Sequence, residues 1–363
     1  MGPRGSQSWV RGPCPRAGRD GYLPFMSGLR REKGQTSAEY LGVVVVVAVI
    51  IGGIAATGLG SRIAEFLEGA VCRIVQGDCG GFDAAGDDDG WVPPPGSEPE
   101  REIFDAGNGN ELPGDPARRE GDDPIGDEEV DAAYENFGLI HRYFLETFER
   151  NSYDGAGAPL IATVRYRRDP DSPFRNAYWD PDRRQMVFGE GYAAPLDVTA
   201  HEVTHALTEA SAGLVYRGES GALNESISDI FASNLDPDDW ELGEDLPDGA
   251  IRDLSDPERF DQPAHVDDYR DLPDTVDNGG VHINSGIPNH AYYNMVQNIG
   301  REASEQIVYR ALTEYLESDS GFEDFRTASL SAAEDLYGED SPEYEGVDEA
   351  FRAVGLDGTW EAP

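Results

Sequence analysis

Two histidines four residues apart constrain this chain more than any other feature. They are His201 and His205, in the segment HEVTHAL. Residues at this spacing lie one helical turn apart on the same face, so both imidazoles could bind a single metal ion. Glu202, next to the first histidine, would lie beside that metal and could hold a water. The H-E-x-x-H pattern is typical of zinc peptidases, and the alternative is a pair of packed histidines with no ligand role.

The surrounding residues predict two helices. Apolar residues and histidines at helical spacing indicate a helix that begins at Asp197, a candidate N-cap, and ends near Gly213. The stretch GALNESISDIF indicates a second helix, which Ser220 could cap. Within it, Glu225 and Asp229 are four residues apart and share a face. A catalytic zinc needs a third protein ligand, for which Glu225 is the candidate, and Asp229 could accept a hydrogen bond from a ligand histidine.

The balance of charge excludes one class of partner. The 363 residues include 71 acidic and 28 basic side chains, a formal net charge of -43. Because such a surface repels phosphate backbones, we expect no nucleic-acid partner. Residues 1–33 are instead basic, with seven basic and two acidic side chains. A hydrophobic content of 39% is sufficient for a packed core.

An uncharged apolar run follows this basic leader at residues 41–56. Extended to residue 60 it has about 20 residues, the length of a membrane-spanning helix, and the alternative is a buried strand. The basic flank predicts a cytoplasmic N-terminus with the rest of the chain outside. We therefore expect a basic leader at 1–34 and a transmembrane helix at 35–60. The catalytic part would be anchored outside the cytoplasm, or secreted after processing.

Residues 26–60 resemble the type IV prepilin signal, in particular that of Flp-type pilins. A basic leader ends at Gly34, the pair Glu39-Tyr40 follows, and the apolar run comes next. The resemblance implies cleavage between Gly34 and Gln35 by a prepilin peptidase, with the pilus machinery as a further partner. The alternative is an uncleaved membrane anchor.

Residues 61–101 are predicted to form a flexible acidic linker. They contain a pair of glycines, a run of three aspartates and three consecutive prolines, with no apolar periodicity. From about residue 103 the chain has the composition of a folded domain. Segments 161–167 and 185–188 are rich in β-branched or aromatic residues, so we expect strands there.

From about residue 103 to 356 the sequence resembles the thermolysin family of metallopeptidases. The resemblance rests on several blocks in order, namely HEVTHAL, LVYRGESGALNESISDIF, DWELGED and DNGGVHINSGI. It implies an α+β fold in two parts, with a β-rich part at 102–196, an α-helical part at 197–363 and a zinc cleft between them.

The resemblance also implies a catalytic role for each matching residue. The expected zinc ligands are His201, His205 and Glu225, and Glu202 is the expected general base that deprotonates the attacking water. His282 and Tyr216 match the donors to the oxyanion, and Asp277 matches the carboxylate that orients His282. Asp229 and Asn224 match the partners of the two ligand histidines. Zinc lowers the pKa of the water that it binds, and the negatively charged tetrahedral intermediate needs hydrogen-bond donors. These roles therefore agree with the chemistry of amide hydrolysis.

Substrate-binding positions match as well. Asn176 and Ala177 match the edge that binds the substrate backbone, and Arg252 matches the arginine that binds the peptide carbonyl beyond the cleaved bond. Walls of the pocket just after that bond are matched by Val198, Leu242 and Ile251. All three are apolar, which predicts a preference for bulky hydrophobic side chains. The alternative is that they are plain core residues.

A group of acidic residues matches the ligands of the family's double calcium site. Calcium prefers several oxygen ligands, which this group offers. The matching residues are Asp197, Asp236, Asp239, Glu241 and Glu244. The loop that carries them is short, so we expect one or two structural calcium ions. The alternative is a solvated acidic loop.

Together these features predict a zinc-dependent metalloendopeptidase with one catalytic zinc. Its substrate would be a peptide or protein, cleaved on the amino side of bulky hydrophobic residues. The alternative function is that of a pilus-associated structural or adhesive protein whose peptidase fold is inactive.

Overall fold

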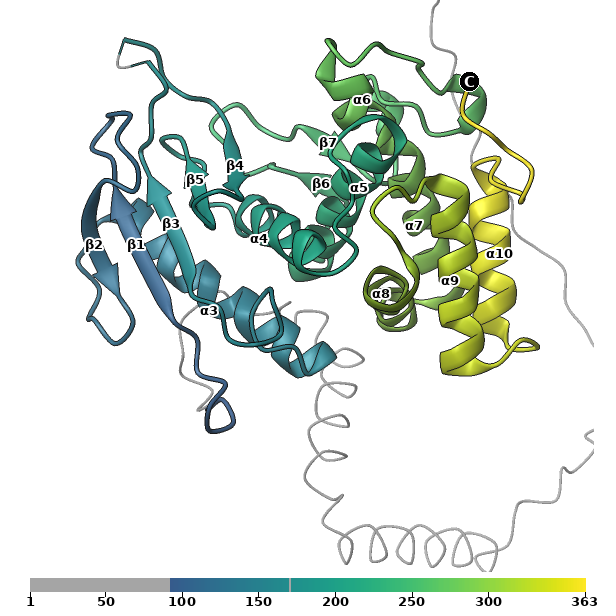
Figure 1. Ribbon diagram of the computed structural model, residues 1–363, viewed down its shortest axis with the longest axis horizontal. Coiled ribbons are helices and arrows are strands. Elements are labelled where there is room, and N and C mark those ends of the chain that lie inside the picture. The colour runs from purple at the N-terminus through teal and green to yellow at the C-terminus, as the bar shows by residue number, and fades with distance from the viewer. Residues whose placement is uncertain (1–91, 170) are drawn as a thin grey trace, which may run out of the picture. The chain divides into compact units, whose positions relative to one another are not determined.

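The computed structural model describes residues 92–169 and 171–363 (Figure 1). The predicted leader, transmembrane helix and prepilin-like segment, and the linker up to residue 91, lie outside the described residues. In the part that is described, no helix combines the length and the apolar character needed to cross a bilayer. Residues 92–100 contain no helix or strand, and the first strand begins at Arg101, one residue before the expected start of the β-rich part.

The N-terminal part is built on a mixed five-stranded sheet in the order β2-β1-β3-β5-β4. Strands β1, β3 and β5 are parallel, and the two edge strands, β2 and β4, are antiparallel to their neighbours. The bounds are β1 Arg101–Asp105, β2 Asp115–Arg119, β3 Leu160–Val164, β4 Ala177–Asp180 and β5 Gln185–Phe188. The two predicted strands are therefore present. The first is shorter than expected because Arg165 has a positive φ of 53° and pairs with Asp105 and Asp127.

A long helix, α3 (Glu128–Phe148), packs against this sheet (Figure 1). Asp127 caps its N-terminus by accepting a hydrogen bond from the Val130 N–H at 3.2 Å. Its buried face includes Phe137, Ile140 and Phe144 and contacts β1, β3 and α4. The part expected to be β-rich thus contains a 21-residue helix as well as the sheet.

The C-terminal part is helical. Its helices are α4 Leu196–Ala210, α5 Gly218–Leu235, α6 Asp277–Asn284, α7 Gly286–Ile299, α8 Arg301–Arg310, α9 Phe322–Tyr337 and α10 Pro342–Ala353. Short elements complete it, namely β6 Glu241–Leu242, β7 Arg252–Asp253, 3-10 turns at Pro257–Phe260 and Val266–Asp268, and a π-helical turn at Ala311–Tyr315. Helix α4 contacts β4 on one side and α5 on the other, so it joins the two parts (Figure 1).

The predicted N-caps of α4 and α5 are wrong. Helix α4 begins one residue before Asp197, whose carboxylate accepts hydrogen bonds from the backbone N–H of Val198 at 2.7 Å and of Gly243. Helix α5 begins at Gly218, so Ser220 lies inside its first turn and donates its hydroxyl to the Ser318 carbonyl at 3.0 Å. In both cases the side chain that could have capped the helix forms a hydrogen bond with a residue distant in sequence instead.

Candidate zinc site and substrate cleft

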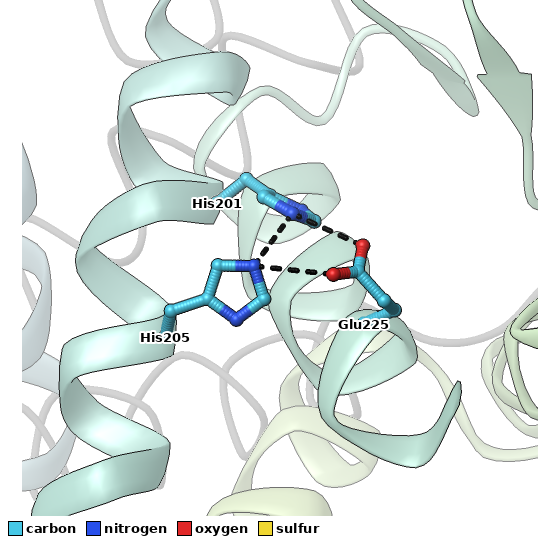
Figure 2. Close-up of side chains that lie close together, drawn as sticks. All are labelled: His201, His205 and Glu225. Atoms are coloured by element: carbon cyan, nitrogen blue, oxygen red, sulfur yellow. Dashed lines mark hydrogen bonds and ion pairs between the residues drawn. The ribbon is translucent and has the colours of Figure 1, made fainter. Parts of the chain in front are cut away.

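Three ligand-type side chains converge where α4 packs against α5 (Figure 2). The Nε2 atoms of His201 and His205 are 3.0 Å apart, and each lies 3.4 Å from a carboxylate oxygen of Glu225. His201 and Glu225 are buried and His205 is half-buried. The structure therefore brings together the three residues predicted as zinc ligands from two different helices.

The other ring nitrogens show why a cation fits here. His201 Nδ1 lies 2.9 Å from Asp229 Oδ1, and His205 Nδ1 lies 2.8 Å from Asn224 Oδ1. Both partners are acceptors, so they favour the tautomers with the proton on Nδ1 and a lone pair on Nε2. Two lone pairs and a carboxylate then face one another, and one oxygen of Glu225 is buried with no hydrogen-bond partner. A divalent cation satisfies all of these groups at once.

Glu202 lies next to this ligand set but does not belong to it. It is buried, and one of its carboxylate oxygens has no hydrogen-bond partner. Burial raises the pKa of Glu202 to about 7, against the opposing effect of His201. Such a carboxyl group can take up and release a proton near neutral pH.

A turn with left-handed backbone positions His282 beside the ligand set, with its Nε2 3.4 Å from Glu225 Oε1. Its Nδ1 lies 2.6 Å from Asp277 Oδ1, and its Nε2 lies 3.2 Å from the Tyr216 hydroxyl. The turn is tight, and Asn278, Gly279 and Gly280 all have positive φ. Burial raises the pKa of the Tyr216 hydroxyl, which also donates to Glu225, so this phenol keeps its proton.

These groups line a cleft of about 480 Å³. The predicted substrate-binding residues all lie on its walls, namely Asn176, Ala177, Arg252, Val198, Leu242 and Ile251. Arg252 donates to Asp229 Oδ1 at 2.7 Å, and the same carboxylate oxygen faces His201. Burial opposes ionisation of Asp229, but Arg252 holds its pKa below the usual value. The Arg252–Asp229 pair thus links the candidate zinc ligand His201 to the wall of the cleft.

Several cleft residues were not predicted from the sequence. Tyr192 and Leu246 extend the apolar wall formed by Val198 and its neighbours, and Trp179 and Glu209 line the cleft elsewhere. Asn289, in α7, donates to the second oxygen of Asp229 at 2.8 Å. The alternation of side chains along β4 could have indicated Trp179, and the spacing of four residues after His205 could have indicated Glu209. The contacts of Tyr192, Leu246 and Asn289 join segments far apart in the chain and carry no local signal.

The residues proposed as calcium ligands form a looser group. Burial, followed by neighbouring carboxylates, raises the pKa of Asp236 to about 6, and burial likewise raises the pKa of Glu244 to about 7. One oxygen of Glu244 is buried without a hydrogen-bond partner, as expected of a cation ligand. Glu241, however, pairs with Arg259. Among the described residues, only the zinc set brings three ligand atoms within 4.8 Å of one another.

A mixed sheet packed on helices, with two histidines and a glutamate converging beside a free carboxylate, defines a metallopeptidase. The catalytic domain of thermolysin metallopeptidases matches residues 102–209, and their alpha-helical domain matches residues 212–356. The chain belongs to the thermolysin family of zinc metalloendopeptidases. Its cofactors are accordingly a catalytic zinc and structural calcium.

Individual relatives agree with this assignment. The neutral protease NprE of Bacillus pumilus is 44% identical over 62% of this chain and 76% of its own length. Bacillolysin of Bacillus subtilis is also 44% identical, but the chain spans only 44% of its length. The precursor of protealysin, a metalloproteinase from Serratia proteamaculans, is 35% identical and superposes with a TM-score of 0.65 over 72% of this chain and 88% of that structure.

Proposed function

We propose that this protein cleaves peptide bonds within extended polypeptide segments, on the amino side of bulky hydrophobic residues. The observation that carries the proposal is the position of Glu202, a buried carboxyl group with a free oxygen beside three convergent ligand atoms. The apolar wall next to it, formed by Val198, Leu242, Leu246 and Ile251, supports the preference for hydrophobic side chains.

The substrate backbone would bind along β4. This strand is at the edge of the sheet, and Asn176 and Ala177 at its start line the cleft. An edge strand offers unpaired backbone N–H and C=O groups, which an extended peptide can pair with. Arg252 would donate to the peptide carbonyl beyond the cleaved bond, since it lines the cleft beside His201.

The chemistry would be divided among the groups already described. Zinc, when bound by His201, His205 and Glu225, lowers the pKa of water to about 7 and polarises a carbonyl group. Glu202 takes the proton from the attacking water and then delivers it to the leaving amine. His282 and Tyr216 donate hydrogen bonds to the oxygen that becomes negative as the carbonyl carbon turns tetrahedral. Asp277 holds the His282 ring so that Nε2 faces the cleft.

The test uses the full chain and a series of peptides that differ only in the residue after the cleaved bond. We expect Leu and Phe to be cleaved faster than Ala or Gly. A zinc chelator should abolish cleavage, and added zinc should restore it with one equivalent bound per chain. Equal rates for Phe and Gly would contradict the predicted specificity, and full activity without zinc would contradict the mechanism.

We also propose that residues 35–60 form a transmembrane helix that anchors the catalytic part outside the cytoplasm. The support is the uncharged run itself and the basic leader before it. Cleavage after Gly34 would release the chain from its leader. Fractionation of cells that express the full chain, with N-terminal sequencing of the product, tests both points. Recovery of an intact leader on a cytoplasmic protein would contradict them. The alternative role as an inactive pilus component gains no support, because the expected ligands, base and oxyanion donors all lie together in one cleft.

A further inference from the structure

Beyond the groups that act on the peptide bond, the cleft carries one more carboxylate, Glu209. Among the described residues that line the cleft, Glu209 and Arg252 are the charged side chains outside the zinc ligands, Glu202 and His282. Arg252 is paired with Asp229. Glu209 is exposed and forms no ion pair with any described residue, so its negative charge is open to a ligand in the cleft.

The position of Glu209 along the cleft follows from helix α4. Val198, on the hydrophobic wall, lies in the first turn, the two histidines lie in the middle, and Glu209 lies in the last turn. Val198 and Glu209 are therefore about 16 Å apart along the helix axis. The hydrophobic pocket and this carboxylate lie on opposite sides of the candidate zinc site.

Strand β4 runs between the same two ends. Just before its start, Arg175 pairs with Asp248 at 2.6 Å, in the loop that also carries Leu246 of the hydrophobic wall. Near its end, the Trp179 indole N–H donates to Glu209 Oε2 at 2.6 Å. A peptide bound along β4 would have the residue after the cleaved bond at the first end and the residues before it at the second.

The Trp179 contact also fixes the carboxylate. One oxygen of Glu209 accepts the indole N–H, and the Trp179 ring is itself packed edge-on against Tyr153, with ring centroids 5.5 Å apart. The contact with Tyr153 fixes the indole ring, and the hydrogen bond from the indole N–H fixes the Glu209 side chain at the end of its helix. A pre-positioned carboxylate loses less entropy when it binds a cation. The face of the indole offers a second attraction for the same charge.

We propose that Glu209 is a specificity-determining residue that selects substrates with arginine or lysine about two residues before the cleaved bond. The inference rests on the proposed direction of substrate binding. Glu209 lies one helical turn, about 6 Å, beyond His205. An extended peptide advances about 3.3 Å per residue, which places its second residue before the bond near the carboxylate.

The experiment uses the zinc-loaded full chain and two peptides that differ only at this position, one with arginine and one with its neutral isostere citrulline. The measured quantity is the ratio of kcat/KM for the two peptides within one enzyme preparation, so differences in active fraction cancel. We expect a wild-type ratio of about two to five, the size of an exposed ion pair, which falls towards one in 1 M salt.

Three variants test whether the Glu209 carboxylate causes the preference for arginine. Glu209→Gln removes the charge but keeps the hydrogen bond acceptor, and its ratio should fall to about one. Trp179→Phe keeps a ring but removes the indole N–H, and should give an intermediate ratio. Glu334→Gln, an exposed residue of α9 outside the cleft, removes the same charge and should keep the wild-type ratio.

A wild-type ratio of one, or an unchanged ratio in Glu209→Gln, would overturn the assignment. A chain that cleaves neither peptide nor any member of the hydrophobic series would contradict the proposed function instead. The two failures are therefore distinguishable.

Discussion

Three buried carboxylates near the candidate zinc site differ in what they contact, and this difference assigns their roles. Asp229 binds Arg252 and Asn289. Glu225 faces His201, His205 and His282, and although burial opposes its ionisation, these histidines, His282 first, hold its pKa well below the usual value. Glu202 lacks such partners on one oxygen, and burial raises its pKa to about 7. Two of these groups are therefore fixed as anions, and Glu202 is the one that can exchange a proton.

Replacement of Glu202 by glutamine tests this division. Glutamine keeps the size of the side chain but cannot accept the proton of water, so we expect kcat to fall by about 10²- to 10⁴-fold. Zinc content and thermal stability should stay close to wild type, because Glu202 is not among the convergent ligands. Both are measured on the sample used for kinetics. A variant with half the wild-type kcat would exclude Glu202 as the base.

Asn224 offers a second test, on metal affinity. Its Oδ1 accepts from His205 Nδ1, and its own amide is fixed by donation to the Leu214 carbonyl at 3.3 Å. Asn224→Ala should weaken zinc binding by about 10- to 100-fold, as measured by competition with a chelator. Ser226→Ala is the matched control, since Ser226 is buried in the same helix and its hydroxyl has no partner. Equal zinc affinity in the two variants would argue against an orienting role for Asn224.

At the scale of single elements, the turn that begins α6 depends on glycine. Gly279 has a φ of 90°, and a Cβ at this position would lie 3.1 Å from the backbone of Gly218 at the start of α5. The turn carries His282 into the cleft, so the close approach of two backbones positions the proposed oxyanion donor.

Gly279→Ala should therefore affect stability and catalysis together. Backbone strain of this kind costs about 1 to 3 kcal/mol, and the contact with Gly218 would displace the turn. We expect a lower Tm and a lower kcat, measured by thermal unfolding and steady-state kinetics. Gly338→Ala is a matched control, because Gly338 has a φ of 99° but nothing within 4 Å of its added Cβ. It should lower the Tm without changing kcat, and an equal loss of kcat in both variants would contradict the role of the α6 turn.

The elements also show what the sequence could predict. The helices with the histidines and with Glu225 were predicted, since periodicity and ligand spacing are local properties of the chain. Helix α3 was missed although Phe137, Ile140 and Phe144 recur at helical spacing, because the resemblance suggested a mainly β-rich part. Asp197 and Ser220 were wrongly predicted to be N-caps, because their hydrogen-bond partners, Gly243 and Ser318, lie far away in sequence. Contacts between residues so far apart in sequence can be identified only in the folded structure.

At the scale of the whole molecule, we expect stability to depend on calcium and pH together, through two carboxyl groups of the acidic loop. The pKa of Asp236 is raised to about 6 and that of Glu244 to about 7, mainly by burial and then by neighbouring carboxylates. Without calcium, the folded chain binds these protons more tightly than the unfolded chain. Their contribution therefore lowers stability as the pH rises from about 4 to 7, through the unfolded and then the folded pKa values.

Calcium binding to these carboxylates would reverse the trend, because the cation replaces the protons. The expected result is that calcium raises the Tm strongly at pH 8 and little at pH 5, measured with zinc present throughout. Glu244→Gln should reduce the increase at pH 8, whereas Glu258→Gln, an exposed residue outside the group, should not. A calcium effect of the same size at both pH values would show that these carboxylates do not bind the ion.

The place of β4 at the edge of the sheet has a consequence for protein substrates. A strand can pair only with a segment whose own backbone hydrogen bonds are free, and folded proteins expose few such segments. Cleavage of a folded protein would then be limited by how often a segment of that protein opens. The rate would measure the local stability of the substrate more than the match of its side chains. Under such conditions the enzyme would cleave unstable proteins faster than stable ones.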